Sequence, residues 1–139
     1  MKTSSGFRIE LTCRYEEWWR YNVEMMCAAF DAADERIGFA AVRSQIAEAG
    51  AELRERPAGV DVPTRLSLES GPCDHALLYL YVIPHTLPRD NRIGAAAPFD
   101  LTLRIALDGR ALRTERIRVN QWGGTSLRLE LAEGMKNQK

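Results

Sequence analysis

What this sequence most clearly lacks is an excess of charge of either sign. Among its 139 residues, 19 are Lys or Arg and 19 are Asp or Glu, so the formal net charge is zero. A strongly basic balance is the usual electrostatic signature of nucleic-acid binding, and we therefore expect no nucleic-acid partner. Lysine is scarce, since Lys2, Lys136 and Lys139 are the only lysines and the other 16 basic residues are Arg. Arg suits carboxylate and phosphate recognition, although a preference for Arg codons explains the same composition.

Long apolar runs are also missing. The longest, Ala76–Ile83, has eight residues, whereas a helix that crosses a bilayer takes about 20, so we expect no membrane insertion. The N-terminus has no apolar segment of the kind that directs secretion. As given, the chain is expected to be cytoplasmic, or secreted or periplasmic if a leader was removed.

Cysteine is rare, and the familiar catalytic patterns are absent. Cys13, Cys27 and Cys73 are odd in number and form no CxxC pair, which argues against a disulfide framework but leaves one bridge open. No GxSxG, HExxH, P-loop or GxGxxG pattern occurs. Cys73 lies near His75 in sequence, but no orienting carboxylate completes a nucleophilic site. We therefore predict a protein that is not an enzyme and that needs no cofactor.

Metal-binding residues are present but badly spaced. His75 and His85 stand at opposite ends of one predicted strand, about 33 Å apart at ~3.3 Å per residue, too far to share an ion. Asp31, Asp34 and Glu35 share a loop but lack the dense D-x-D spacing that calcium favours. We expect no metal site, with a calcium-dependent sandwich as a lesser alternative.

Strict alternation of apolar and polar side chains predicts several β-strands. Residues 7–15 and 19–27 both alternate, and the pair is predicted to form an antiparallel hairpin. Residues 36–43 are read as a third strand with Ile37, Phe39 and Ala41 on one face, and a helix from Asp31 onward stays open as an alternative. Residues 64–69 predict another short strand.

The pattern changes in two places. Residues 44–56 show helical spacing and are predicted to form a short helix that Ser44 caps. Ala76–Ile83 is apolar throughout, which predicts a central strand covered on both sides.

Asp108-Gly109 predicts a type I′ hairpin turn between strands 101–107 and 110–119, and residues 127–131 are predicted to form a last amphipathic strand.

Seven or eight such strands predict a mainly β protein, an antiparallel β-sandwich of the C2-like, transthyretin-like or immunoglobulin-like kind with one short helix near 44–56. We expect one domain over residues 7–132, preceded by a flexible N-terminus at 1–6 and followed by a polar tail at 133–139.

Surface aromatics offer one candidate binding site. If Trp19 faces the core, its neighbour Trp18 faces outward in an extended strand, and an exposed aromatic ring can stack on a sugar. The alternative, in which both rings pack inside, stays open. A carbohydrate or other small-ligand site would combine loop 84–98 with Trp18, Tyr21, Trp122, Arg89 and Arg92.

Outward-facing arginines offer the second candidate. Arg104, Arg116, Arg118 and Arg128 alternate with inward residues on the C-terminal strands and could meet an acidic partner or remain a solvated sheet face. The sequence thus favours a non-enzymatic interaction or structural module, an assembly subunit or adaptor. Its expected partner is another protein or a second copy of itself, as a homo-oligomer.

Overall fold

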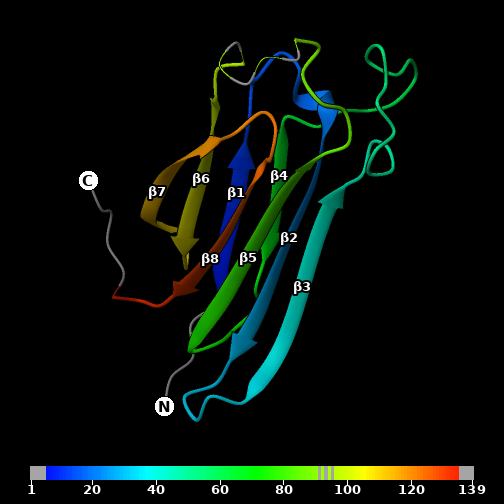
Figure 1. The fold of residues 1–139 in the computed structure, drawn as a ribbon. Coiled ribbons are helices and arrows are strands. Elements are labelled where there is room, and N and C mark those ends of the chain that lie inside the picture. Colours follow the sequence, from blue (N-terminus) through cyan, green and yellow to red (C-terminus); the bar gives the residue numbers. More distant parts are fainter. Residues whose placement is uncertain (1–5, 91, 93, 95, 135–139) are drawn as a thin grey trace.

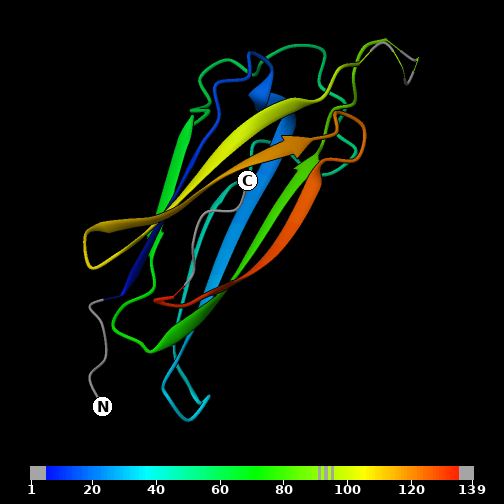
Figure 2. The same cartoon turned by 90° about the vertical axis from the view of Figure 1, so that its left-hand side faces the viewer.

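The alternating pattern folds into eight strands in the computed structural model, which describes residues 6–90, 92, 94 and 96–134. The strands form two antiparallel sheets of four, stacked as two layers (Figure 1 and Figure 2), and this confirms the predicted β-sandwich. The elements are β1 (Phe7–Thr12), the 3-10 turn η1 (Trp18–Arg20), β2 (Tyr21–Phe30), β3 (Arg36–Ser44), β4 (Arg65–Glu69), β5 (His75–Pro84), β6 (Phe99–Leu107), β7 (Arg110–Val119) and β8 (Thr125–Leu131).

The chain crosses repeatedly from one sheet to the other. Sheet I has the strand order β4-β1-β6-β7, and sheet II has the order β3-β2-β5-β8. Only β2–β3 and β6–β7 are consecutive strands paired within one sheet. The crossing from β7 to β8 is tight at Gly124, where φ is +72° and a Cβ would lie 1.9 Å from the Val82 carbonyl oxygen. Only glycine fits there.

The core lies between the sheets and is made by every second residue of each strand. Strand β2 alternates buried and half-buried positions over its whole length, and β5 does the same as far as Val82. Burying a Leu, Ile or Met side chain contributes roughly 1.5–3 kcal/mol. The largest fully buried apolar side chains come from both sheets and include Phe7, Ile9, Leu11, Met25, Leu78, Leu80, Leu101, Leu103, Ile105 and Leu107.

Several predicted elements are confirmed. Residues 36–43 fall within β3, so the helical alternative for this segment is wrong. The predicted strands at 64–69 and 127–131 correspond to β4 and β8. Asp108 and Gly109 both have positive φ, +52° and +81°, as the type I′ turn requires.

The predicted hairpin between residues 7–15 and 19–27 is wrong. Strand β1 pairs with β4 and β6 in sheet I, whereas β2 pairs with β3 and β5 in sheet II. Strand β1 ends at Thr12, and the turn η1 then carries the chain across the sandwich. Alternation identifies a strand with one buried face, but it does not identify the strand's neighbours.

The predicted helix at 44–56 is also wrong, because the described chain runs there as an irregular loop. Most of its described backbone hydrogen bonds go to other segments, and the bond from the Ala51 amide to the Glu48 carbonyl closes only a single turn. The Asn22 side chain accepts from the Ile46 and Ala47 amides and donates to the Ala47 carbonyl. Glu52 has a positive φ of +51° and donates its amide to the His85 carbonyl. The helical spacing of the apolar residues in 44–56 therefore reflects which side chains reach the core, and not a helical backbone.

Both predicted terminal segments lie largely outside the described residues. Of the predicted flexible segment 1–6 and polar tail 133–139, residues 1–5 and 135–139 lie outside the described residues. Within the residues that the structure does describe, no helix has the length and apolar character needed to span a membrane.

Arg20 is a buried cation at the loop end of the sandwich, only 2% exposed. Its guanidinium donates to the Glu17 carboxylate at 2.9 Å, the Thr86 carbonyl at 3.2 Å and the Tyr15 hydroxyl at 3.1 Å. It also donates to the Gln121 side chain. Buried guanidinium groups are tolerated only when they are partnered in this way. Arg20 therefore fixes three segments that are far apart in the sequence.

We predict that Arg20→Ala destabilises the fold by about 2–4 kcal/mol, because it removes a packed side chain and leaves buried acceptors unpaired. Urea unfolding followed by tryptophan fluorescence measures this. Arg8→Ala serves as the control, since Arg8 is 58% exposed in a surface pair with Glu69 and such pairs contribute about 0–1 kcal/mol. Equal losses in the two variants would contradict the role given to Arg20.

Candidate functional site

The outer face of sheet II is apolar and uncovered. Its strands are in register so that Met26 lies between Ala41 and Tyr79, and Ala28 lies between Phe39 and Leu77. Residues opposite one another on antiparallel strands share a face. Together with Ile37, Tyr81 and Ile83, these residues form what we call the apolar face. Three of its members, Ile37, Phe39 and Ile83, are 51%, 58% and 50% exposed.

The apolar face corrects the prediction that Ala76–Ile83 is covered on both sides. The inward residues Ala76, Leu78, Leu80 and Val82 are buried as expected. The outward residues Leu77, Tyr79 and Tyr81 are half-buried and Ile83 is exposed, and no second layer of the described chain lies over this side (Figure 2). The run is apolar throughout because its even-numbered side chains face the core and its odd-numbered side chains form part of the apolar face.

The charged side chains on the apolar face are balanced. Glu24 on β2 lies between Arg43 and Tyr81 in the strand register, so this pair is within the face on the side of Ile83. On the edge strand β8, Arg128 and Glu130 form an ion pair at 3.5 Å. The part of the face around Met26 and Ala28 has no charged side chain, and these two pairs add no net charge.

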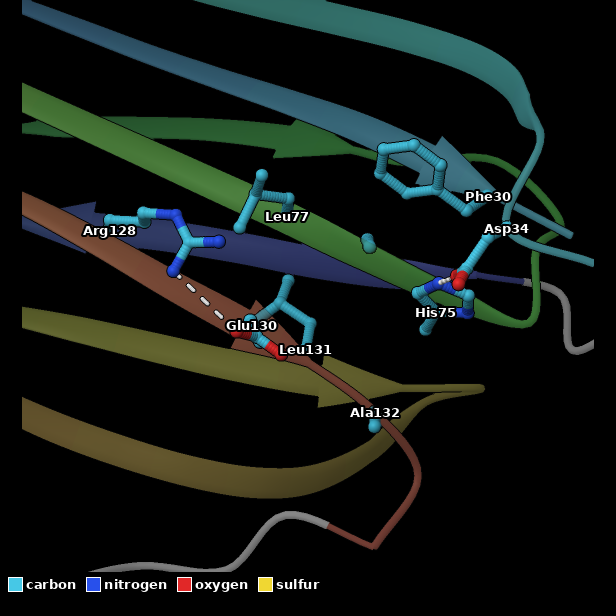
Figure 3. A pocket seen from close by; sticks show the side chains of 9 residues that line it. Phe30, Asp34, His75, Leu77, Arg128, Glu130, Leu131 and Ala132 are labelled. Atoms are coloured by element: carbon cyan, nitrogen blue, oxygen red, sulfur yellow. Dashed lines mark ion pairs between the residues drawn. The ribbon is translucent and has the colours of Figure 1, made fainter. Parts of the chain in front are cut away.

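A groove of about 350 Å³ opens at one end of the apolar face. Figure 3 shows Phe30 and His75 on one side of it and Arg128 and Glu130 on the other. The His75 ring stacks on Phe30 with centroids 5.4 Å apart. Its nitrogens bond to Asp34 at 2.6 Å and to Asp74 at 2.9 Å. The hydrogen bond to Asp74 is the main cause that raises the pKa of His75, and Asp34 adds to it.

The predicted arginine strip is divided between the two sheets. Arg104 lies on β6, and Arg116 and Arg118 lie on β7, all on the outer face of sheet I. Arg128 lies on β8 at the edge of sheet II. The first three therefore share one surface, and Arg128 belongs with the apolar face.

The predicted aromatic site is not assembled. Trp18 and Trp19 are both buried, at 4% and 7% exposure, because η1 replaces the extended geometry on which the outward position of Trp18 depended. Trp18 donates to the Pro63 carbonyl and packs near Tyr21, which is also buried. Trp122 is half-buried in the turn before β8.

Arg89 and Arg92, the other predicted members of that site, are exposed in the loop after β5. Arg89 lines a hollow of about 660 Å³ beside Trp19 and Glu52, and it donates to the Arg54 carbonyl. Trp18 and Tyr21 face the interior, so the structure does not bring them together with these arginines on one surface.

The buried histidine of the loop end is fully hydrogen-bonded. His85 is inaccessible to solvent and its Nε2 lies 2.7 Å from the Trp19 carbonyl oxygen. A carbonyl only accepts, so Nε2 carries the proton and Nδ1 accepts from the Thr86 hydroxyl at 2.8 Å. Burial lowers the pKa of His85. This network leaves His85 neutral and structural.

The three thiols have no catalytic setting. Cys13, Cys27 and Cys73 are buried thiols. Burial raises the pKa of Cys13 to about 11 and that of Cys27 to about 12, and it also raises the pKa of Cys73. Thiols in this state are protonated and poor nucleophiles. Among the described residues, no group of three or more His, Cys, Asp or Glu side chains is arranged to hold a metal ion.

Comparisons with protein-family models, with curated proteins and with solved structures found no match to this chain. The two outer faces of the sandwich are therefore the candidate functional surfaces. The apolar face was missed from the sequence, although its signal was present. Ile37, Phe39 and Ala41 alternate with small or half-buried residues, and the odd positions of Ala76–Ile83 are as apolar as the even ones.

We predict that the two histidines titrate on opposite sides of the ordinary value of about 6.5. The pKa of His75 is raised and that of His85 is lowered. The stabilisation from His75 is complete below pH 6.5 and is lost as the pH rises through its raised pKa. The stabilisation from His85 is complete above pH 6.5 and is lost as the pH falls through its lowered pKa. Proton NMR of the imidazole Cε1–H signals measures both, and His75→Gln should remove the upper titration. Two coincident midpoints near 6.5 would contradict this assignment.

We predict that almost none of the thiols in the native protein react with a thiol reagent at pH 8, because all three are buried and protonated. After denaturation, three thiols per chain should react with dithionitrobenzoate. A count of one would reveal a disulfide, and rapid reaction of the native protein would show that a thiol is accessible.

Proposed function

We propose that this protein is a non-enzymatic contact module that assembles with a second copy of itself through the apolar face. The observation that supports the proposal best is the uncovered outer side of sheet II, where Ile37, Phe39 and Ile83 are each at least half exposed. Contiguous apolar surface of this kind typically marks an interaction site.

The chemistry of the face suits protein contact. Tyr79 and Tyr81 lie parallel with ring centroids 6.4 Å apart, and Phe39 lies on the edge strand β3, on the other side of β2. Aromatic side chains dominate the binding energy of interfaces because they bury large areas at low entropic cost. The part of the face around Met26 and Ala28 has no charged side chain that would need to be desolvated, and Glu24, beside Tyr81, lies opposite Arg43.

The charge pattern favours a second copy as the occupant. We consider a two-fold axis in the plane of the face, perpendicular to the strands and between the Met26–Tyr79 and Ala28–Leu77 pairs. Tyr79 is opposite Arg128 and Leu77 is opposite Glu130. This axis therefore places Arg128 of each copy over Glu130 of the other, and both ion pairs are repeated by symmetry.

The same axis keeps the strands of the two copies nearly aligned. Sheets that pack face to face do so at about −30°, so a second sandwich can lie on the first without rearrangement of sheet II. An isologous contact of this type closes on itself and gives a dimer instead of a filament.

We predict that the wild-type protein dimerises at micromolar concentration and that Phe39→Glu weakens the dimer at least about tenfold, which is 1.4 kcal/mol. The substitution places a carboxylate in the apolar face twice per dimer. Sedimentation equilibrium or light scattering after size exclusion measures it. Ser67→Glu is the matched control, because Ser67 is exposed on the outer face of sheet I.

The register of the dimer has its own test. Arg128→Glu alone and Glu130→Arg alone should each oppose assembly, since like charges then meet across the two-fold axis. An equimolar mixture of these two variants should form a mixed dimer, because every contact is then between opposite charges. A wild-type protein that stays monomeric at high micromolar concentration would contradict the proposed function, and failure of the mixture alone would contradict only this register.

A further inference from the structure

The outer face of sheet I has a hollow whose chemistry is the opposite of the apolar face. The hollow measures about 640 Å³, and four of its lining residues are Arg14, Arg65, Arg104 and Thr102. It lies on the far side of the sandwich from the apolar face (Figure 2). Any ligand of the hollow is therefore independent of the proposed dimer.

The strand register brings two hydroxyls together between arginines. Thr12 on β1 is opposite Arg65 on β4 and Thr102 on β6. Thr102 is in turn opposite Arg116 on β7. One row across the sheet therefore reads arginine, threonine, threonine, arginine, with all four side chains on the outer face.

Arginine exceeds carboxylate in and around the hollow. Its two carboxylates, Glu10 and Asp100, are each close to one arginine, since Glu10 lies 3.7 Å from Arg65 and Asp100 lies 3.5 Å from Arg118.

Arg14 and Arg104 line the hollow and Arg116 adjoins it, and within the part of the chain that the structure describes these three make no ion pair or hydrogen bond. Three guanidinium groups are thus available to an anion.

The floor of the hollow contains an unpartnered polar atom. The Thr12 hydroxyl oxygen is shielded from solvent and has no hydrogen-bond partner among the described residues. A buried hydroxyl without a partner costs about 1–3 kcal/mol. Once the side chains that shield the Thr12 hydroxyl move aside, it can donate a hydrogen bond to a ligand oxygen in the hollow, and that bond would remove the cost.

We infer that this hollow is a binding site for a tetrahedral oxyanion, a phosphate or sulfate group. Arg104, Arg14 and the Thr102 hydroxyl, which line the hollow, would donate to it, and the Thr12 hydroxyl would join them once it is uncovered. Guanidinium groups bind phosphate and sulfate oxygens through charge-assisted hydrogen bonds, often two at a time. Several donors on different strands can bond to the separate oxygens of a tetrahedral group, whereas a carboxylate offers only two oxygens.

Titration of the full chain with sodium phosphate, followed by amide NMR, tests the inference directly. Sodium sulfate and sodium acetate form the second and third arms, and sodium chloride at matched ionic strength is the reference. Saturable shifts at Thr12, Thr102 and Arg104 with phosphate or sulfate, and weaker shifts with acetate, are expected. The absence of saturable shifts, or equal shifts with chloride, would overturn the inference.

Variants separate a built site from general attraction to positive charge. Arg104→Gln should weaken phosphate binding at least about fivefold, whereas Glu10→Gln should strengthen it, because it removes a competing carboxylate and frees Arg65. Arg8→Gln is the control, since Arg8 lies outside the hollow on the same face and changes the net charge equally. Equal weakening by Arg8→Gln and Arg104→Gln would overturn the inference, as would weaker binding by a folded Glu10→Gln variant.

Discussion

The buried guanidinium of Arg20 holds the loop end of this sandwich together. It is 2% exposed, and it bonds to Tyr15, Glu17, Thr86 and Gln121. These partners come from the crossing before β2, the loop after β5 and the turn before β8. Because three crossings converge on one cation, the ends of β2, β5 and β8 are fixed relative to one another, and these are three of the four strands of sheet II.

A rigid scaffold with two dissimilar outer faces is the consequence. Sheet II presents Phe39, Tyr79 and their apolar neighbours, whereas sheet I presents arginines and threonines in register. The interior of the sandwich is filled by side chains and the thiols are buried. The proposed contact function would use these faces, and the difference between them would let the protein bind two unlike partners at once.

Residue patterns predicted some features of the candidate sites and missed others. The arginines on β6 and β7 were correctly placed on one outward face, because period-two alternation fixes the side of a strand. Arg128 was grouped with them wrongly, since only the strand order shows that β8 belongs to the other sheet. Trp18 was expected outward from extended geometry, and the short turn η1 reverses that expectation. Arg65 joins the hollow only through the pairing of β4 with β1, and Arg14 lies just after the end of β1.

The sequence by itself determined which segments are strands and where the Asp108-Gly109 turn falls, because alternation and positive φ are local properties. The tertiary structure decided which sheet each strand joins. It placed β1 and β2 in different sheets. It also kept residues 44–56 from forming a helix, because backbone amides of that segment bond to Asn22, His85 and Thr86. It also decided that one side of Ala76–Ile83 stays uncovered. These outcomes depend on contacts between residues far apart in the chain, and no local periodicity encodes them.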